Sequence, residues 1–289
     1  MKKSKTMILA VITILIMALG IAACGNSDDK PSEEAGVKLI EISLTEEDYA
    51  FGVAKDQPEL SKAVNEFISE IQGNGTLDEI FEKYFGGGTP VAVKSAELDP
   101  GKDQLVVATN ASFEPFEYML GEDYYGIDME IAALMADHLD KELVISNMDF
   151  DAVCLSVGQG KADIAMAGLT VTESRKEFVE FSDSYYAASQ NIIVIADDTT
   201  FDECKDSSEV ETILSELGED TKIGVQNGTT GQFYVEGDDD WGFVGFDVTC
   251  VGYNAGSLAV QDMLNGNINY VIIDEAPAQF IVTSVNELN

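Results

Sequence analysis

Apolar positions along the chain follow two spacings that alternate from one segment to the next. Short apolar runs, such as LVVAT at 105–109 and NIIVIA at 191–196, have the length and β-branched content of buried strands. Other segments, such as 58–71, carry an apolar residue every three or four positions, which is the spacing of one helix face. Strands that alternate with helices predict βαβ units around a parallel sheet, so the expected fold class is α/β.

The same spacings place the remaining elements. Expected strands occupy 37–44, 50–54, 105–109, 142–146, 163–169, 191–196, 222–226 and 270–273. Expected helices occupy 58–71, 76–84, 129–139, 152–157, 175–181, 208–217, 230–235, 257–265 and 276–285. Asp56 is expected to cap the first helix, and Thr76 with Glu79 to form a capping box for the second. Gly and Pro at both ends of the next stretch predict a linker at 86–103.

The N-terminal residues have the pattern of an export signal. Lys2, Lys3 and Lys5 precede an apolar run at 7–23 that is short for a membrane span. We therefore expect a signal peptide at 1–23.

The end of that run predicts a lipid anchor. In LGIAAC, small residues stand directly before Cys24 and resemble the lipobox of bacterial lipoproteins, in which the Cys is lipidated, for example with palmitate. The alternative is a free Cys near an ordinary cleavage site. The polar, acidic segment 24–35 is expected to be a flexible tether.

Charge and composition exclude several classes of function. The chain has 16 Lys and Arg against 53 Asp and Glu, and its net charge is -37. Nucleic-acid binding needs clustered Lys and Arg, so no nucleic-acid partner is expected. The one histidine, His138, is expected at the surface of a helix. A His-based metal site or a Ser-His-Asp triad therefore has almost nothing to be built from, and we expect no metal and no cofactor.

Cysteines allow one disulfide at most. Besides Cys24 the chain has Cys154, Cys204 and Cys250, an odd number for an oxidising compartment. Cys154 lies in the helix-like run 150–157 and is expected to be a buried small apolar residue. Cys204 and Cys250 remain as the possible pair.

The stretch 162–186, ADIAMAGLTVTESRKEFVEFSDSYY, carries the most informative chemistry. A strand that leads into a helix N-terminus presents unpaired N–H groups, and Arg175 adds a fork that can bind a carboxylate with two hydrogen bonds. The carbonyl of Gly168 and the hydroxyl of Thr170 can accept hydrogen bonds from an ammonium. One turn can therefore hold both charged groups of an α-amino acid. The alternative is an ordinary corner with a solvated Arg.

Other strand ends add candidates. Asp274 follows a strand at the edge where open α/β sheets bind ligands, and it can also cap the next helix. The turn QNGTTG at 226–231 lacks the Lys of a phosphate-binding loop, so it gives little support to nucleotide binding. Aromatic residues crowd the loop NASFEPFEYML, where they either pack in the core or line a site.

Several blocks together resemble the solute-binding proteins of polar amino acid ABC transporters, family 3 of the periplasmic binding proteins. The blocks are LVVATNASFEPFEY, GIDMEIAALMADHL, the stretch 148–186, IGVQNGTTGQFY and VIIDEAPAQF. The resemblance implies a two-lobe, type II architecture with a hinge. It implies that the ligand-binding residues are Asn110, Phe113, Phe150, Ala167, Gly168, Thr170, Arg175, Gln226, Thr229, Thr230 and Asp274.

The resemblance also implies a role for each end of the ligand. Arg175 holds the carboxylate, and Gly168 and Thr170 hold the ammonium in a site that Asp274 completes. The turn containing Thr229 and Thr230 closes over the ligand.

The resemblance places neutral groups around the side chain of the ligand. By the resemblance, Asn110 and Phe113 line the first lobe, and Phe150 packs on the ligand side chain. The family often has Asp at position 110 and a basic residue at 226. Asn110 and Gln226 are neutral amides, so we expect a neutral polar or small amino acid.

The order of elements departs from the family pattern. The segment 37–86 resembles the last segment of the family but comes first here, which is the order of a circular permutation. Lobe one is then 49–185, including the linker, and lobe two is 37–44 plus 190–289. The strand at 37–44 is expected to pair within lobe two, with hinge crossings near 45–49 and 185–190.

These expectations combine into one function with two alternatives. The expected protein is monomeric, lipid-anchored at the extracytoplasmic face of the cell membrane, and delivers a free L-amino acid to an ABC permease. One alternative is an enzyme on the same scaffold, similar to cyclohexadienyl dehydratase, in which Glu114 or Asp274 transfers a proton. The other is a ligand-sensing subunit of a receptor.

Overall fold

The computed structural model describes residues 36–288, so the predicted signal peptide, the Cys24 lipid site and the tether lie outside the described residues. Within 36–288, no helix combines the length and the apolar content needed to cross a membrane. The described residues belong to one compact unit that contains two five-stranded sheets.

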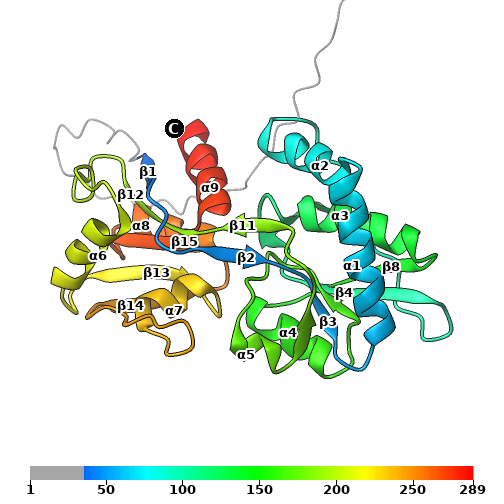
Figure 1. Ribbon diagram of the computed structural model, residues 1–289. Coiled ribbons are helices and arrows are strands. Elements are labelled where there is room, and N and C mark those ends of the chain that lie inside the picture. The colour runs from blue at the N-terminus through cyan, green and yellow to red at the C-terminus, as the bar shows by residue number, and fades with distance from the viewer. Residues whose placement is uncertain (1–35, 289) are drawn as a thin grey trace, which may run out of the picture. The chain divides into compact units, whose positions relative to one another are not determined.

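The first sheet has the strand order β10-β3-β9-β4-β8. β4 is parallel to β8 and β9, whereas β3 is antiparallel to β9 and β10. Its strands are β3 (Gly52–Ala54), β4 (Gln104–Thr109), β8 (Glu142–Asn147), β9 (Ile164–Ala165) and β10 (Val179–Phe181). Its helices are α1 (Pro58–Gly73), α2 (Thr76–Phe85), α3 (Ile127–His138), α4 (Phe150–Gly158) and α5 (Glu173–Lys176). α1 packs on β3 and α3, and α4 packs on β4 (Figure 1).

The second sheet has the order β1-β12-β15-β13-β14, so it contains both the first strand and the last strand of the described chain. Its strands are β1 (Val37–Ile40), β12 (Gln190–Ile195), β13 (Lys222–Gln226), β14 (Thr249–Tyr253) and β15 (Tyr270–Asp274). Its helices are α6 (Ser207–Glu216), α7 (Thr230–Glu236), α8 (Gly256–Leu264) and α9 (Glu275–Leu288). β1 pairs with β12 antiparallel, with Val37 opposite Ile195. The first strand therefore joins the sheet that the sequence predicts for it, although it is shorter than expected.

Two smaller sheets complete the described fold. β2 (Glu47–Tyr49) and β11 (Tyr186–Ala188) are the chain segments that lead from one large sheet to the other, and they pair antiparallel with each other (Figure 1). The expected crossings at 45–49 and 185–190 thus form a two-stranded ribbon. The aromatic loop after β4 forms a three-stranded sheet of β5 (Ser112–Phe113), β6 (Glu117–Leu120) and β7 (Asp123–Tyr125).

The predicted helix at 175–181 is wrong. α5 ends at Lys176, and the residues that follow form β10, which pairs with β3 so that Val179 lies opposite Ala54. Three ladder pairs and the burial of Val179 outweigh a helical spacing that spans less than two turns. β2, β11, β14 and the β5–β7 sheet were also not predicted, because each of these strands spans five residues or fewer.

Two predicted helix caps are wrong, although both helices form. The cap of α1 is Gln57 and not Asp56. α2 begins at Thr76 itself after Gly75, whose φ of 84° suits glycine, so Thr76 and Glu79 do not form a capping box. The apolar stripe of α1 is buried as predicted, with Val64, Phe67, Ile68 and Ile71 in the core.

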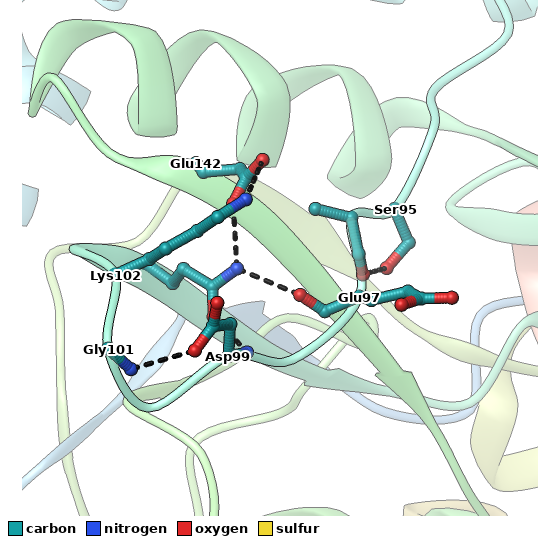
Figure 2. A network of polar contacts seen from close by, with 8 residues as sticks. Ser95, Glu97, Asp99, Gly101, Lys102 and Glu142 are labelled. Carbon is teal, nitrogen blue, oxygen red and sulfur yellow. Dashed lines mark hydrogen bonds and ion pairs between the residues drawn. The ribbon is translucent and has the colours of Figure 1, made fainter.

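The predicted linker is held against the first sheet by polar contacts. Figure 2 shows Lys102 reaching Glu142 of β8, with a distance of 2.9 Å from Nζ to Oε2, and Gly101 donating its backbone N–H to Asp99. Further back, Val93 forms a β-bridge with Tyr124. The segment therefore connects α2 to β4 along a defined path.

Within residues 36–288 the three cysteines are free. Cys154 is buried, as predicted, and Cys204 and Cys250 are half-buried and unpaired. The disulfide considered from the sequence is not formed. Cys250 packs beside Glu236, and burial together with that carboxylate raises the pKa of its thiol to about 12.

Candidate functional site

Arg175 lies on the one-turn helix α5 with only 8% of its surface exposed. The side chain of Thr172 accepts a hydrogen bond from the Arg175 backbone N–H at 3.1 Å, which caps the turn and orients it. The guanidinium donates to the carbonyl oxygens of Thr170, at 2.7 Å, and Gly228, at 3.0 Å. Its central carbon lies 5.0 Å from the centroid of the Phe150 ring.

No carboxylate of the described chain lies within ion-pair distance of Arg175. A buried guanidinium is costly unless it is paired, and the two carbonyls leave further N–H donors unused. Gly228 belongs to the turn between β13 and α7, so the guanidinium already bridges residues that follow strands of both large sheets. The geometry is that of an anion site that two lobes share.

Asp274 and Glu47 form the opposite end of the site. Asp274 ends β15, is 4% exposed and accepts a hydrogen bond from the Tyr49 hydroxyl at 2.5 Å. Glu47 on β2 is 5% exposed and accepts hydrogen bonds from Thr45 at 2.6 Å, Thr170 at 2.7 Å and the Gln190 amide at 3.1 Å. Among residues 36–288, no Lys, Arg or His lies within ion-pair distance of either carboxylate.

The electrostatics of this end favour a bound cation. Burial, and secondly the negative charge of Glu47, raise the pKa of Asp274 to about 7, against the hydrogen bonds from Tyr49 and Gln190. Burial and the nearby Asp274 also raise the pKa of Tyr49 well above its usual value. An ammonium placed here would replace the missing positive charge.

Thr170 connects the two ends. Its carbonyl accepts from Arg175 and its hydroxyl donates to Glu47, so the anion site and the cation site lie on either side of one residue. Thr170 also forms a β-bridge with Tyr49. The predicted roles of Arg175 and Asp274 thus fall at opposite ends of a single network.

Neutral amides from the two lobes also meet in a direct hydrogen bond. The Gln226 amide donates to Asn110 Oδ1 at 3.1 Å, and the Asn110 amide donates to the Met148 carbonyl at 2.7 Å. Thr229 donates its hydroxyl to the Gln226 carbonyl at 2.8 Å. Several buried polar atoms of the described chain have no hydrogen-bond partner here, namely Oε1 of Gln226, Oε1 of Gln190 and Oγ1 of Thr230. Such atoms are expected where a polar ligand binds.

The turn before Thr170 fits closely against an aromatic wall. Gly168 has a φ of 53°, and a Cβ built on it would lie 2.8 Å from a ring carbon of Phe113, so only glycine is accommodated. Its N–H donates to Asp128 at 2.9 Å, and its neighbour Ala167 is fully buried. Phe113 also lines a cavity of 420 Å³ together with Glu114 and residues of α8 and α9.

The sequence missed Glu47, Tyr49 and Gln190. They lie in segments interpreted as connectors, and their partners are distant along the chain. The one available signal was alternation in TEEDY, since a strand there places Thr45, Glu47 and Tyr49 on one face.

Comparison with known proteins identifies the family of the chain. The family model of bacterial extracellular solute-binding proteins, family 3, matches residues 1–87 and 105–272. The chain belongs to this family. Among the sequence relatives of this family 3 protein is a probable histidine-binding protein of Neisseria gonorrhoeae, 29% identical over 195 residues that cover 66% of this chain and 65% of that protein.

Solved structures give the same result for the fold. The chain is similar to the truncated, arginine-bound ArgBP from T. maritima, with a TM-score of 0.52 and 31% identity, covering 63% of this chain and 78% of that one. It is also similar to the ancestral amino acid-binding protein AncCDT-1, described as a precursor of cyclohexadienyl dehydratase, with a TM-score of 0.53 and 25% identity, covering 72% and 78%. This family 3 protein therefore has the two-lobe α/β architecture of periplasmic amino-acid-binding proteins.

The matches cover part of each relative. The chain spans between 37% and 65% of the length of the first three sequence relatives, whose names describe binding of arginine or histidine.

Proposed function

We propose that this protein captures a free L-α-amino acid between its two lobes and delivers it to an ABC permease. One observation carries the proposal. A buried Arg175 without an ion-pair partner lies at one end of the network, two buried carboxylates without one, Asp274 and Glu47, lie at the other, and Thr170 lies between them. A free α-amino acid carries a carboxylate and an ammonium on the same carbon atom, which is the complementary arrangement. The names of the sequence relatives support the same ligand class.

Closure of the lobes is the proposed mechanism of capture. Two contacts, Arg175 with Gly228 and Gln226 with Asn110, join turns that follow strands of different sheets. A ligand bound between these groups is enclosed when the lobes close, and closure excludes water from both charged ends of the ligand. The β2–β11 ribbon is the proposed hinge, because both chain crossings run through it.

The proposed ligand has a neutral polar or small side chain. Asn110 and Gln226 offer amide groups and no charge toward the expected side-chain position, whereas a cationic side chain favours a facing carboxylate. Because the named relatives bind arginine or histidine, this preference is tested directly.

Isothermal titration of the twenty L-amino acids against protein refolded free of ligand tests the class and the preference together. Each amino acid that binds is compared with its α-N-acetyl derivative and with its α-carboxamide, which remove one charged group each. We expect both derivatives to lose at least about tenfold in affinity, because each leaves one buried charge without its partner. Binding of the derivatives at unchanged affinity would contradict the proposal, and tightest binding of arginine, lysine or glutamate would overturn the side-chain preference.

The proposed location is the extracytoplasmic face of the cell membrane, with a lipid on Cys24. Its support is the lipobox-like LGIAAC and the polar segment that follows. Mass spectrometry of the membrane-extracted protein should find the mature chain starting at a diacylglycerol-modified Cys24, and Cys24→Ala should release the protein from the membrane. A mature chain that starts elsewhere would contradict the anchor.

The proposed order of elements is a circular permutation of the family, in a protein that acts as a monomer. The family model matches in two separate segments, and the residues between them, 88–104, coincide with the predicted linker 86–103 to within one residue at the C-terminal end. The pairing of β1 with β12 also brings the first described strand beside an element from the second half of the chain.

An enzyme on this scaffold is the second candidate, and one observation favours it. The chain is similar to AncCDT-1, and Asp274, with a pKa of about 7, has the proton affinity of a general acid or base. Incubation of the purified protein with each bound amino acid and detection of products by mass spectrometry separates the two. Release of the unchanged amino acid supports binding alone, and a dehydrated product supports the enzyme.

A further inference from the structure

Glu47 lies on a strand face that points into the site. In β2, Glu47 and Tyr49 are buried whereas Asp48 between them is exposed, as strand alternation requires. β2 pairs with β11 at Ala188, so Glu47 lies within the proposed hinge and not on either lobe. A carboxylate at this position contacts both lobes without belonging to one of them.

The partners of Glu47 come from three segments. Thr45 belongs to the same crossing, Gln190 is the first residue of β12 in the second sheet, and Thr170 belongs to the turn before α5. All three donate and Glu47 only accepts, because an ionised carboxylate has no hydrogen to give.

This direction of the hydrogen bond decides what Thr170 can do. A threonine hydroxyl has one hydrogen, and in this structure it is directed to Glu47 Oε2 at 2.7 Å. The oxygen of Thr170 can then offer only lone pairs to a ligand. Asp274, held by Tyr49 from the same face of β2, is also an acceptor. With Asp274 ionised, this end of the site therefore presents acceptors alone, which a group with several donors and no lone pair satisfies.

We propose that Glu47 is the positioning residue that makes the site selective for a protonated α-amino group. By fixing the Thr170 hydroxyl as an acceptor and adding a negative charge, it favours an ammonium and disfavours ligands that place a hydroxyl, a carbonyl or a methylene there. This inference rests on the proposed capture of amino acids and identifies which residue enforces the α-amino requirement.

The experiment compares Glu47→Gln with the unsubstituted protein by isothermal titration. The probes are L-glutamine with 4-carbamoylbutanoate and L-arginine with 5-guanidinopentanoate; each second compound lacks only the α-amino group. Glu46→Gln is the matched control, because Glu46 is the adjacent residue, carries the same charge and is exposed.

We expect Glu47→Gln to weaken the amino acid about tenfold to hundredfold while the deamino compound changes less than about threefold, so that the preference between them collapses. Glu46→Gln should leave the preference unchanged. Equal losses for both compounds would mean that Glu47 only supports the hinge, and no loss for either would mean that it has no role; both results overturn the inference. Failure of every L-amino acid to bind the unsubstituted protein would instead reject the proposed function and the inference with it.

Thr170 offers a second route to the same test if Glu47→Gln does not fold. Thr170→Val keeps the shape of the side chain and removes the acceptor oxygen, so it should reduce the same preference, and Thr170→Ser should restore it. A preference that Thr170→Val leaves intact would contradict the proposed role of the hydroxyl.

Discussion

Arg175 is the residue whose removal should matter most for binding. If a ligand carboxylate is buried against it, Arg175→Ala leaves that charge unpaired at a cost of about 3–5 kcal/mol, or roughly a hundredfold to several thousandfold in affinity. Calorimetry with the preferred amino acid measures the loss. Lys176→Ala is the control, since Lys176 is adjacent, cationic and paired with Glu173 at the surface. A loss below about threefold for Arg175→Ala would remove the anion site from this account.

Asp274 should make binding depend on pH. Its pKa in the folded protein, about 7, lies above the ordinary value of 3.8, so the ligand-free protein carries the proton between these values. An ammonium needs the carboxylate, hence binding should release a proton near pH 6.5 and weaken as the pH falls below about 7. The Glu47 and Glu117 carboxylates and the Tyr49 hydroxyl lie near the same carboxylate, and burial raises the pKa of Tyr49 and of Glu117 well above their usual values.

Stability of the ligand-free protein should follow the opposite sense. A raised folded-state pKa gives a contribution to the free energy of unfolding that is complete below pH 3.8 and is lost as the pH rises to about 7.

The proton released on binding can be counted directly. Titrations in two buffers of different ionisation enthalpy count the released protons, and Asp274→Asn should abolish the release while the chain still folds. Proton release that persists in Asp274→Asn would assign the titration to another group.

At the scale of single residues, chemistry within one turn could be predicted from the sequence, whereas partners distant along the chain could not. Arg175, Thr170 and Gly168 could be predicted because one short turn contains them. Glu47 could not, because its carboxylate acquires a role only when Thr170 and Gln190 fold beside it.

The strand β1 lies at one edge of the second sheet. It pairs with β12 on one side, and Asn286 of α9 holds its first residue through two hydrogen bonds, from the Val37 N–H at 3.1 Å and to the Val37 carbonyl at 2.9 Å. Amides of β1 should therefore exchange faster than those of β12 in the ligand-free protein and slow down when an amino acid binds.

Asn286→Ala tests this support. Loss of the two side-chain hydrogen bonds should raise the exchange rate in β1 by about threefold to tenfold, whereas Glu287→Ala, an exposed neighbour, should not. Hydrogen exchange followed by mass spectrometry resolves the peptide. Unchanged exchange in Asn286→Ala would show that α9 does not hold the strand.

Elements were predictable where their pattern was long. The stripe of α1 and the runs of β4 and β12 gave nearly their observed bounds. Short elements were not predictable: β10 looked helical from its spacing, and only its pairing with β3 makes it a strand. β2 and β11 likewise exist because they pair with each other.

For the whole molecule, the proposed permutation predicts that the order of segments can be reversed. Val37 and Asn286 are in contact, so a short Gly-Ser link from 288 to 36 closes a small gap. A chain that runs 91–288, the link and then 36–90 should fold and bind the same amino acid within about threefold. Circular dichroism and calorimetry measure both. A rearranged chain that stays unfolded would contradict the equivalence of the two orders.

The overall architecture was predictable because alternating strands and helices predict α/β, and because the family pattern extends over most of the chain. The number of sheets and the strand order of each depend on long-range pairing, such as β1 with β12, which no local pattern contains.

Native mass spectrometry of the folded protein as purified, without refolding, tests the central claim most directly. We predict an added mass equal to one free amino acid, which dissociates when the protein is dialysed against denaturant and returns when that amino acid is added back. Arg175→Ala purified in the same way should carry no such mass. A protein that carries no amino acid and gains none from a mixture of all twenty would contradict the account.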